Sequence, residues 1–157
     1  MDLPARKPHV LVVEDDPDMR RLVAWILRKD GYLVEQANAG AELLSRAQRI
    51  TRAGASDAFD VIVSDVMMPD LTAFEVIDAL RFRNLATPII LLTAYGAASL
   101  RPDASALGVH AILDKPVDWA VLRTVVRDAL SEASQQLDLG ADPELPEDGL
   151  QVIADGV

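Results

Sequence analysis

Short runs of apolar, often β-branched residues alternate with longer segments of helical periodicity over most of the chain. The apolar runs lie at residues 9–13, 32–37, 60–64, 89–92 and 111–113. The helical segments lie at residues 17–31, 41–53, 74–80, 97–107 and 117–134. Continuous apolar strands separated by helices are typical of a parallel sheet covered on both faces. Because such crossovers are right-handed, the pattern predicts a doubly wound α/β domain with five strands.

The alternating pattern stops after the last helical segment. Residues 135–157 contain prolines, glycines and acidic side chains, a composition that favours an acidic, largely disordered tail or a linker. We therefore expect a folded domain over residues 8–134 and a tail over residues 135–157.

The net charge of −10 belongs mainly to the C-terminal end. Every lysine and arginine lies at or before Arg127, whereas eight acids lie from Asp128 onward. The first 127 residues carry 17 acids against 15 bases, so neither part offers the basic face that nucleic-acid binding needs. The absence of cysteine excludes disulfides and thiolate metal sites. No apolar segment approaches the ~18 residues of a membrane span, so we expect a cytoplasmic protein.

Polar side chains follow four of the five strands, at the edge where sites form in open α/β sheets. They are Glu14, Asp15, Asp65, Thr93 and Lys115. Three carboxylates at close quarters repel one another unless a cation joins them, and an all-oxygen donor set favours Mg²⁺. A carboxylate beside Mg²⁺ and a lysine can act as a nucleophile toward phosphorus. The residue types therefore support Asp65 as a phosphate acceptor.

Each of these residues also has an ordinary structural interpretation. An acid after a buried strand is a common helix N-cap, so Asp15 or Asp16 could simply cap the first helix. A hydroxyl at a strand end and an exposed lysine need no special function, and only the convergence of four strand ends favours a site. The two histidines, His9 and His110, have surface or strand-edge interpretations and are assigned no role.

Four motifs, in order along the chain, resemble the receiver domain of bacterial two-component response regulators, the family of the chemotaxis receivers. They are VLVVEDD, SDVMMPD, LLTA and DKP, and the resemblance spans residues 8–130. It implies a flavodoxin-like fold with strand order 2-1-3-4-5. It also implies that Asp65 accepts a phosphoryl group from a histidine kinase or phosphotransfer protein. Mg²⁺ would be bound by Asp15, Asp65 and the backbone carbonyl of Met67, with Glu14 acting through water.

The same resemblance implies how the signal is passed on. Thr93 and Lys115 would contact the phosphoryl group, and movement of Thr93 would alter the face built by the fourth helix, fifth strand and fifth helix. An unidentified downstream protein would bind there, and a homodimer through this face is a further option. The domain would catalyse only its own phosphorylation and dephosphorylation, so a conventional enzyme is not expected.

Four features depart from the family pattern. Ile112 stands where an aromatic residue is usual, which questions the aromatic rotamer switch. Ala73 stands where a glycine is usual, at a cost of roughly 1 kcal/mol if the backbone needs a positive φ. The connection at residues 53–59 is longer than usual and is expected to lengthen the helix or form a surface loop. The segment at 97–107 contains Pro102 and is only weakly amphipathic, which predicts a short or mobile helix.

Two variable positions lie two residues after Asp65 and Thr93. They hold Met67 and Tyr95, and the family uses these positions to admit or exclude the attacking water. Neither side chain is an acid or amide that orients water well, so we expect slow loss of the phosphoryl group.

Two other functions compete with the phosphorylated switch. A pseudo-receiver would be an interaction scaffold that is never phosphorylated. A haloacid-dehalogenase-like phosphohydrolase would also use an aspartate and Mg²⁺. Such an enzyme usually has a second acid at the position of Met67 and an additional cap domain, and neither is expected here. We expect either a stand-alone receiver or the receiver part of a longer regulator.

Overall fold

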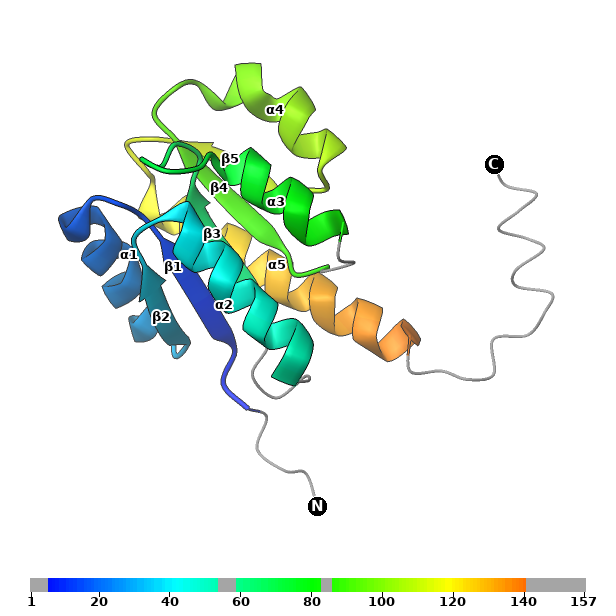
Figure 1. Ribbon diagram of the computed structural model, residues 1–157. Helices are drawn as coiled ribbons and strands as arrows, with labels where there is room; N and C mark the ends of the chain where they lie inside the picture. Colours follow the sequence, from blue (N-terminus) through cyan, green and yellow to red (C-terminus); the bar gives the residue numbers. More distant parts are fainter. Residues whose placement is uncertain (1–5, 54–58, 83–85, 141–157) are drawn as a thin grey trace.

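The computed structural model describes residues 6–53, 59–82 and 86–140, in which five helices flank one parallel sheet (Figure 1). The strand order is β2-β1-β3-β4-β5 and every neighbouring pair is parallel, which confirms the predicted doubly wound fold. The strands are β1 (His9–Val13), β2 (Leu33–Ala37), β3 (Val61–Asp65), β4 (Ile89–Thr93) and β5 (Ala111–Asp114). The helices are α1 (Pro17–Lys29), α2 (Gly40–Ala53), α3 (Ala73–Phe82), α4 (Ala97–Ala106) and α5 (Trp119–Gly140).

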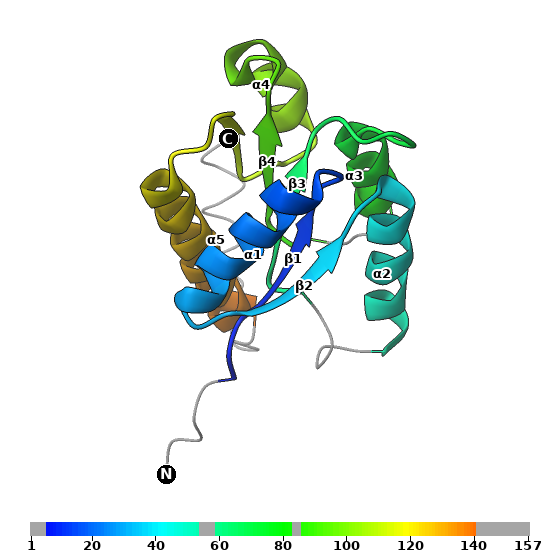
Figure 2. The same ribbon diagram turned by 90° about the vertical axis from the view of Figure 1, so that its left-hand side faces the viewer.

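Alternate residues of the central strands face two separate helix layers. In β1, Val10 and Val12 pack in a core cluster with α1 and α5, whereas Leu11 and Val13 pack in a second cluster with α2, α3 and α4. Figure 2 shows α1 and α5 on one face of the sheet and α2 and α3 on the other. All five residues of β3 and of β4 are buried, as continuous apolar runs in a doubly covered sheet predict.

The ends of α1 show why the chain turns where it does. Asp16 caps the helix, and its carboxylate accepts hydrogen bonds from the backbone amides of Asp18 and Met19. Pro17 follows as the first helical residue, where its missing N–H costs nothing. Gly31 lies just past the end with a φ of 94°, a conformation that residues with a Cβ adopt only at a cost.

Helix α4 forms over ten residues although Pro102 lies inside it. Pro102 therefore does not shorten the helix relative to the predicted segment 97–107, and the alternative expectation, a mobile helix, stays a prediction. The expectation of weak amphipathicity is right, because only Ala97 and Ala104 are buried. The departure at Ile112 is accommodated in the core, where the side chain is 7% exposed and belongs to the α2–α3–α4 cluster.

The last helix is longer than the sequence predicts. Helix α5 continues to Gly140 instead of ending near residue 134, so residues 135–140 are helical and do not begin the tail. No proline interrupts this stretch before Gly140, the first strong helix breaker. Residues 141–157, the rest of the predicted tail, and the predicted loop at 54–58 lie outside the described residues. Within the described part of the chain, no helix combines the length and apolar character that a membrane span requires.

Candidate functional site

The parallel register brings four strand ends to the same edge of the sheet. Asp65 is the last residue of β3 and Thr93 is the last residue of β4. Glu14 and Lys115 come directly after β1 and β5. Since β1 and β4 both pair with β3, and β5 pairs with β4, these side chains gather where the sequence predicted a site.

Three carboxylates form a compact acidic cluster at this edge. Glu14, Asp15 and Asp65 each offer an oxygen atom, and these atoms lie within 4.8 Å of one another. Glu14 is only 4% exposed and Asp65 is 9% exposed, whereas Asp15 faces solvent. The cluster therefore consists of two buried carboxyl groups and one, Asp15, that is exposed to solvent.

Lys115 joins the two enclosed acids. Its Nζ donates to Glu14 Oε1 at 2.8 Å and to Asp65 Oδ2 at 3.1 Å. Burial acts to lower the pKa of the Lys115 ammonium, but the hydrogen bonds to Glu14 and Asp65 outweigh it and the pKa lies above its ordinary value. The backbone N–H of Lys115 donates to the carbonyl of Thr93 at 2.7 Å, which fixes the start of the loop that carries the lysine.

Glu14 is a buried carboxyl group with a raised pKa. Burial raises its pKa to about 7, and the Asp65 carboxylate adds to the rise, while Lys115 opposes it. Its second oxygen, Oε2, is buried and accepts no hydrogen bond from any described residue. An orphaned buried oxygen beside two more carboxylates suits a hard divalent cation, and the donor set therefore fits Mg²⁺.

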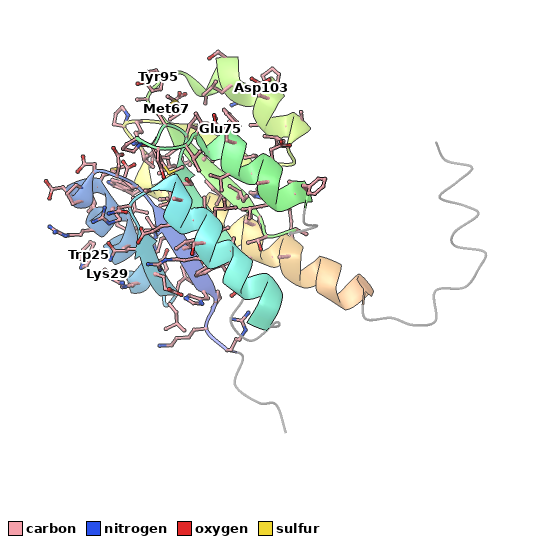
Figure 3. The ribbon with its side chains drawn as sticks, viewed as in Figure 1. Trp25, Lys29, Met67, Glu75, Tyr95 and Asp103 are labelled. Atoms are coloured by element: carbon pink, nitrogen blue, oxygen red, sulfur yellow. The ribbon has the colours of Figure 1, made fainter. Side chains whose placement is uncertain are left out.

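Thr93 and two exposed side chains complete this edge. Thr93 is fully buried, and its Oγ1 accepts a hydrogen bond from the backbone N–H of Tyr95 at 3.0 Å. The N–H of Met67 donates a long hydrogen bond of 3.4 Å to Asp65 Oδ1. The side chains of Met67 and Tyr95 are exposed and lie at the same end of the molecule (Figure 3). Each of them lies two residues after a buried residue of the site, Met67 after Asp65 and Tyr95 after Thr93.

Two alternatives from the sequence are settled by local geometry. The capping role belongs to Asp16, and Asp15 instead joins the acidic cluster. Ala73 needs no glycine-like backbone, because it is the first residue of α3 and is fully buried. Its N–H donates to the carbonyl of Val66 at 2.8 Å, which closes the loop after Asp65.

Two carboxylates near the site went unnoticed in the sequence. Asp114 Oδ1 accepts a hydrogen bond of 2.6 Å from the N–H of Ala97, at the start of α4. Asp70 accepts hydrogen bonds from the N–H groups of Gly40 and Ala41, at the start of α2. Both contacts join distant segments, so helix-capping patterns, which are local, could not reveal them. The signals that the sequence offered were the positions of Asp70 at the end of SDVMMPD and of Asp114 directly before Lys115.

Comparison with known proteins identifies one family that matches most of this chain. The family model described as response regulator receiver domain matches residues 10–127. Transcriptional regulatory protein GlrR of Escherichia coli (strain K12) is 31% identical over 135 residues, which cover 85% of this chain and 29% of that protein. Transcriptional regulatory protein FixJ of Azorhizobium caulinodans is 30% identical over 127 residues, covering 81% and 57%. This chain therefore spans less than two thirds of the length of these relatives.

A solved structure shares both sequence and fold. The chemotaxis response regulator CheY4 of Vibrio cholerae is 34% identical, with a TM-score of 0.70 over 80% of this chain and 100% of that chain. The comparison therefore supports the doubly wound fold.

Proposed function

This chain belongs to the response regulator receiver domain family, and we propose that it is a switch in which Asp65 accepts a phosphoryl group. Receiver domains are signalling domains of two-component systems rather than conventional enzymes. The observation that carries the proposal is the arrangement around Asp65. Lys115 bonds both Asp65 and Glu14, and the buried Oε2 of Glu14 lacks a hydrogen-bond donor among the described residues.

The transfer needs little chemistry from the protein beyond positioning. A carboxylate oxygen of Asp65 forms a bond to phosphorus as the phosphorus–nitrogen bond of a phosphohistidine breaks and the imidazole departs. Lys115 is already within hydrogen-bond distance of Asp65 and stabilises charge on the transferred oxygens. Glu14, Asp15, Asp65 and the carbonyl of Met67 are the groups that would hold Mg²⁺, which neutralises negative charge on the phosphoryl oxygens when bound.

We infer that Thr93 senses the modification. Its hydroxyl is buried at the end of β4 and bonds the Tyr95 N–H, so a phosphoryl oxygen on Asp65 would compete for it. A shift of Thr93 would pull on the loop that leads into α4. We infer that output passes through the α4–β5–α5 face to a downstream protein, and that a histidine kinase or phosphotransfer protein supplies the phosphoryl group.

We further infer that the phosphoryl group is lost slowly. Met67 and Tyr95 are exposed two residues after Asp65 and Thr93, and neither is an acid or amide that would orient a hydrolytic water toward phosphorus. Replacing Met67 by asparagine is expected to shorten the lifetime of the phosphorylated protein, whereas Met67→Leu leaves it unchanged. Equal lifetimes for the two variants would contradict this role.

The proposal is tested by intact mass after incubation with Mg²⁺ and acetyl phosphate. We expect a gain of one phosphoryl group that disappears in Asp65→Asn and is strongly reduced in Lys115→Ala. Chelation of the divalent cation is expected to abolish the gain in the unsubstituted protein. No gain from acetyl phosphate or from a phosphorylated histidine phosphotransfer protein would favour an unphosphorylated interaction scaffold.

A further inference from the structure

A shallow groove lies between α3 and the end of α4. The hollow has a volume of about 420 Å³. Its lining comes from three residues of α3 and three at the end of α4, namely Phe74, Glu75, Asp78, Asp103, Ala106 and Leu107. Figure 3 shows Glu75 and Asp103 on the two helices that form its walls. The groove does not include the acidic cluster around Asp65.

The floor of the groove is apolar and continues along α3. Phe74 and Leu107 are half-buried and pack against the core, while Ala106 is exposed. A second hollow of about 550 Å³ adjoins it, sharing Glu75 and Asp78, and is lined also by Ala79, Arg81 and Phe82. Phe82 is 89% exposed, which leaves a large apolar side chain in water. Phe82 therefore adds an exposed apolar side chain on α3 beside the groove.

Hydrogen bonds join the two sides of the groove, α3 and the end of α4, in the absence of a partner. Arg81 of α3 donates from Nε to the carbonyl of Leu107 at 3.1 Å and from its guanidinium to the carbonyl of Gly108 at 3.3 Å. It also donates to the carbonyl of Thr87 at 3.2 Å. These bonds hold the end of α4 against α3, so a ligand would not have to assemble the groove.

The rim of the groove is negatively charged on both walls. Glu75, Asp78 and Asp103 are all exposed. Among the described residues, none of the three forms an ion pair with a lysine or arginine. Such a rim repels phosphate groups, which argues against nucleic acid and anionic membranes. It also repels the segment 141–157, which contains acids but no lysine or arginine.

We propose that this groove binds a basic amphipathic helix of another protein. Leucine-like side chains on one face of that helix would fill the hollow above Phe74 and Leu107, and flanking lysines or arginines would meet Glu75, Asp78 and Asp103. Helix-in-groove binding uses this combination of apolar anchors and complementary charge. The groove lies between α3 and the end of α4 and is already formed in the unphosphorylated chain.

The test uses the full chain, unphosphorylated, with a synthetic amphipathic peptide of about four helical turns. The peptide carries leucines on one face and lysines beside them, and a matched peptide carries glutamates instead. We expect the lysine peptide alone to bind, with backbone amide shifts confined to α3 and the end of α4. Shifts that map elsewhere, or equal binding of the two peptides, would overturn the proposal.

Variants separate a specific groove from general attraction to an acidic protein. Asp78→Lys/Asp103→Lys is expected to weaken binding by about tenfold, and Phe82→Ser to weaken it less. Asp18→Lys/Glu132→Lys changes the net charge by the same amount at exposed positions on α1 and α5, and is expected to leave the affinity unchanged. Equal losses in the two double variants would overturn the proposal. So would concentration-dependent self-association that Asp78→Lys/Asp103→Lys abolishes, because the occupant would then be a second copy.

Discussion

Helices α3 and α4 have ten residues each and follow neighbouring strands, yet the two are held by different kinds of contact. Helix α3 buries Ala73, Val76, Ile77 and Leu80, whereas α4 buries only two alanines. Helix α4 begins after Gly96, which provides no side-chain cap, and the carboxylate of Asp114 takes its place. The two helices thus differ in how much apolar surface they remove from water.

This difference bears on where the molecule can move. Apolar burial stabilises roughly in proportion to the area removed from water, so displacing α3 costs far more than displacing α4. Regions with few buried contacts open locally at lower free energy. Helix α4 also follows the short loop that connects it to Thr93, the last residue of β4. A change at Asp65 would therefore be expected to move α4 and leave α3 in place.

The largest expected effect comes from truncating the buried face of α3. Leu80→Ala should reduce the free energy of unfolding by about 2–5 kcal/mol, because Leu80 is 1% exposed and the cavity cannot easily collapse. The matched change in α4, Ala104→Gly, should cost only about 1 kcal/mol from lost helix propensity. Urea unfolding of both variants measures the two values. A larger loss for Ala104→Gly would contradict the comparison.

The cap from Asp114 should matter locally and less for the whole fold. Asp114→Ala removes the acceptor for the Ala97 N–H and is expected to cost about 0.5–2 kcal/mol, as for other lost helix caps. Amide hydrogen exchange should accelerate over the first turn of α4 and stay unchanged in α3. Asp103→Ala, on the same helix beyond its first turn, serves as the control. The same acceleration in both variants would rule out a specific cap.

The smallest effect concerns a charged contact between α1 and α5. The guanidinium group of Arg123 forms a bidentate salt bridge with the carboxylate of Asp30, with hydrogen bonds of 2.8–3.1 Å. These hydrogen bonds hold the pKa of the Asp30 carboxyl below its ordinary 3.8. A lowered pKa stabilises the fold above pH 3.8, and this contribution is lost as the pH falls through the lower, folded value. Asp30→Asn should therefore destabilise slightly at pH 6 and flatten the decline in stability below pH 4. Unfolding midpoints of the unsubstituted protein and of Asp30→Asn, measured across this pH range, give the pH dependence of stability for each. Parallel dependence in the two proteins would contradict a lowered pKa of Asp30.

The features that could be predicted from the sequence were those set by the order of the residues and by the spacing of apolar positions. The apolar runs located all five strands, and the acids, threonine and lysine after them located the edge where Lys115 meets Glu14 and Asp65. Contacts between distant segments could not be predicted in this way. The bond from Ala97 to Asp114 and the pairing of Arg123 with Asp30 depend on how helices pack on the sheet. The unusual pKa of Glu14 likewise follows from burial, which the residue type does not reveal.

The most direct test of the proposed switch is amide hydrogen exchange before and after treatment with acetyl phosphate and Mg²⁺. The proposal predicts altered protection in the Thr93–Tyr95 loop and in α4, unchanged protection in α3, and no response in Asp65→Asn. Equal changes in α3 and α4, or a response that persists in Asp65→Asn, would contradict a switch that acts from Asp65 on α4.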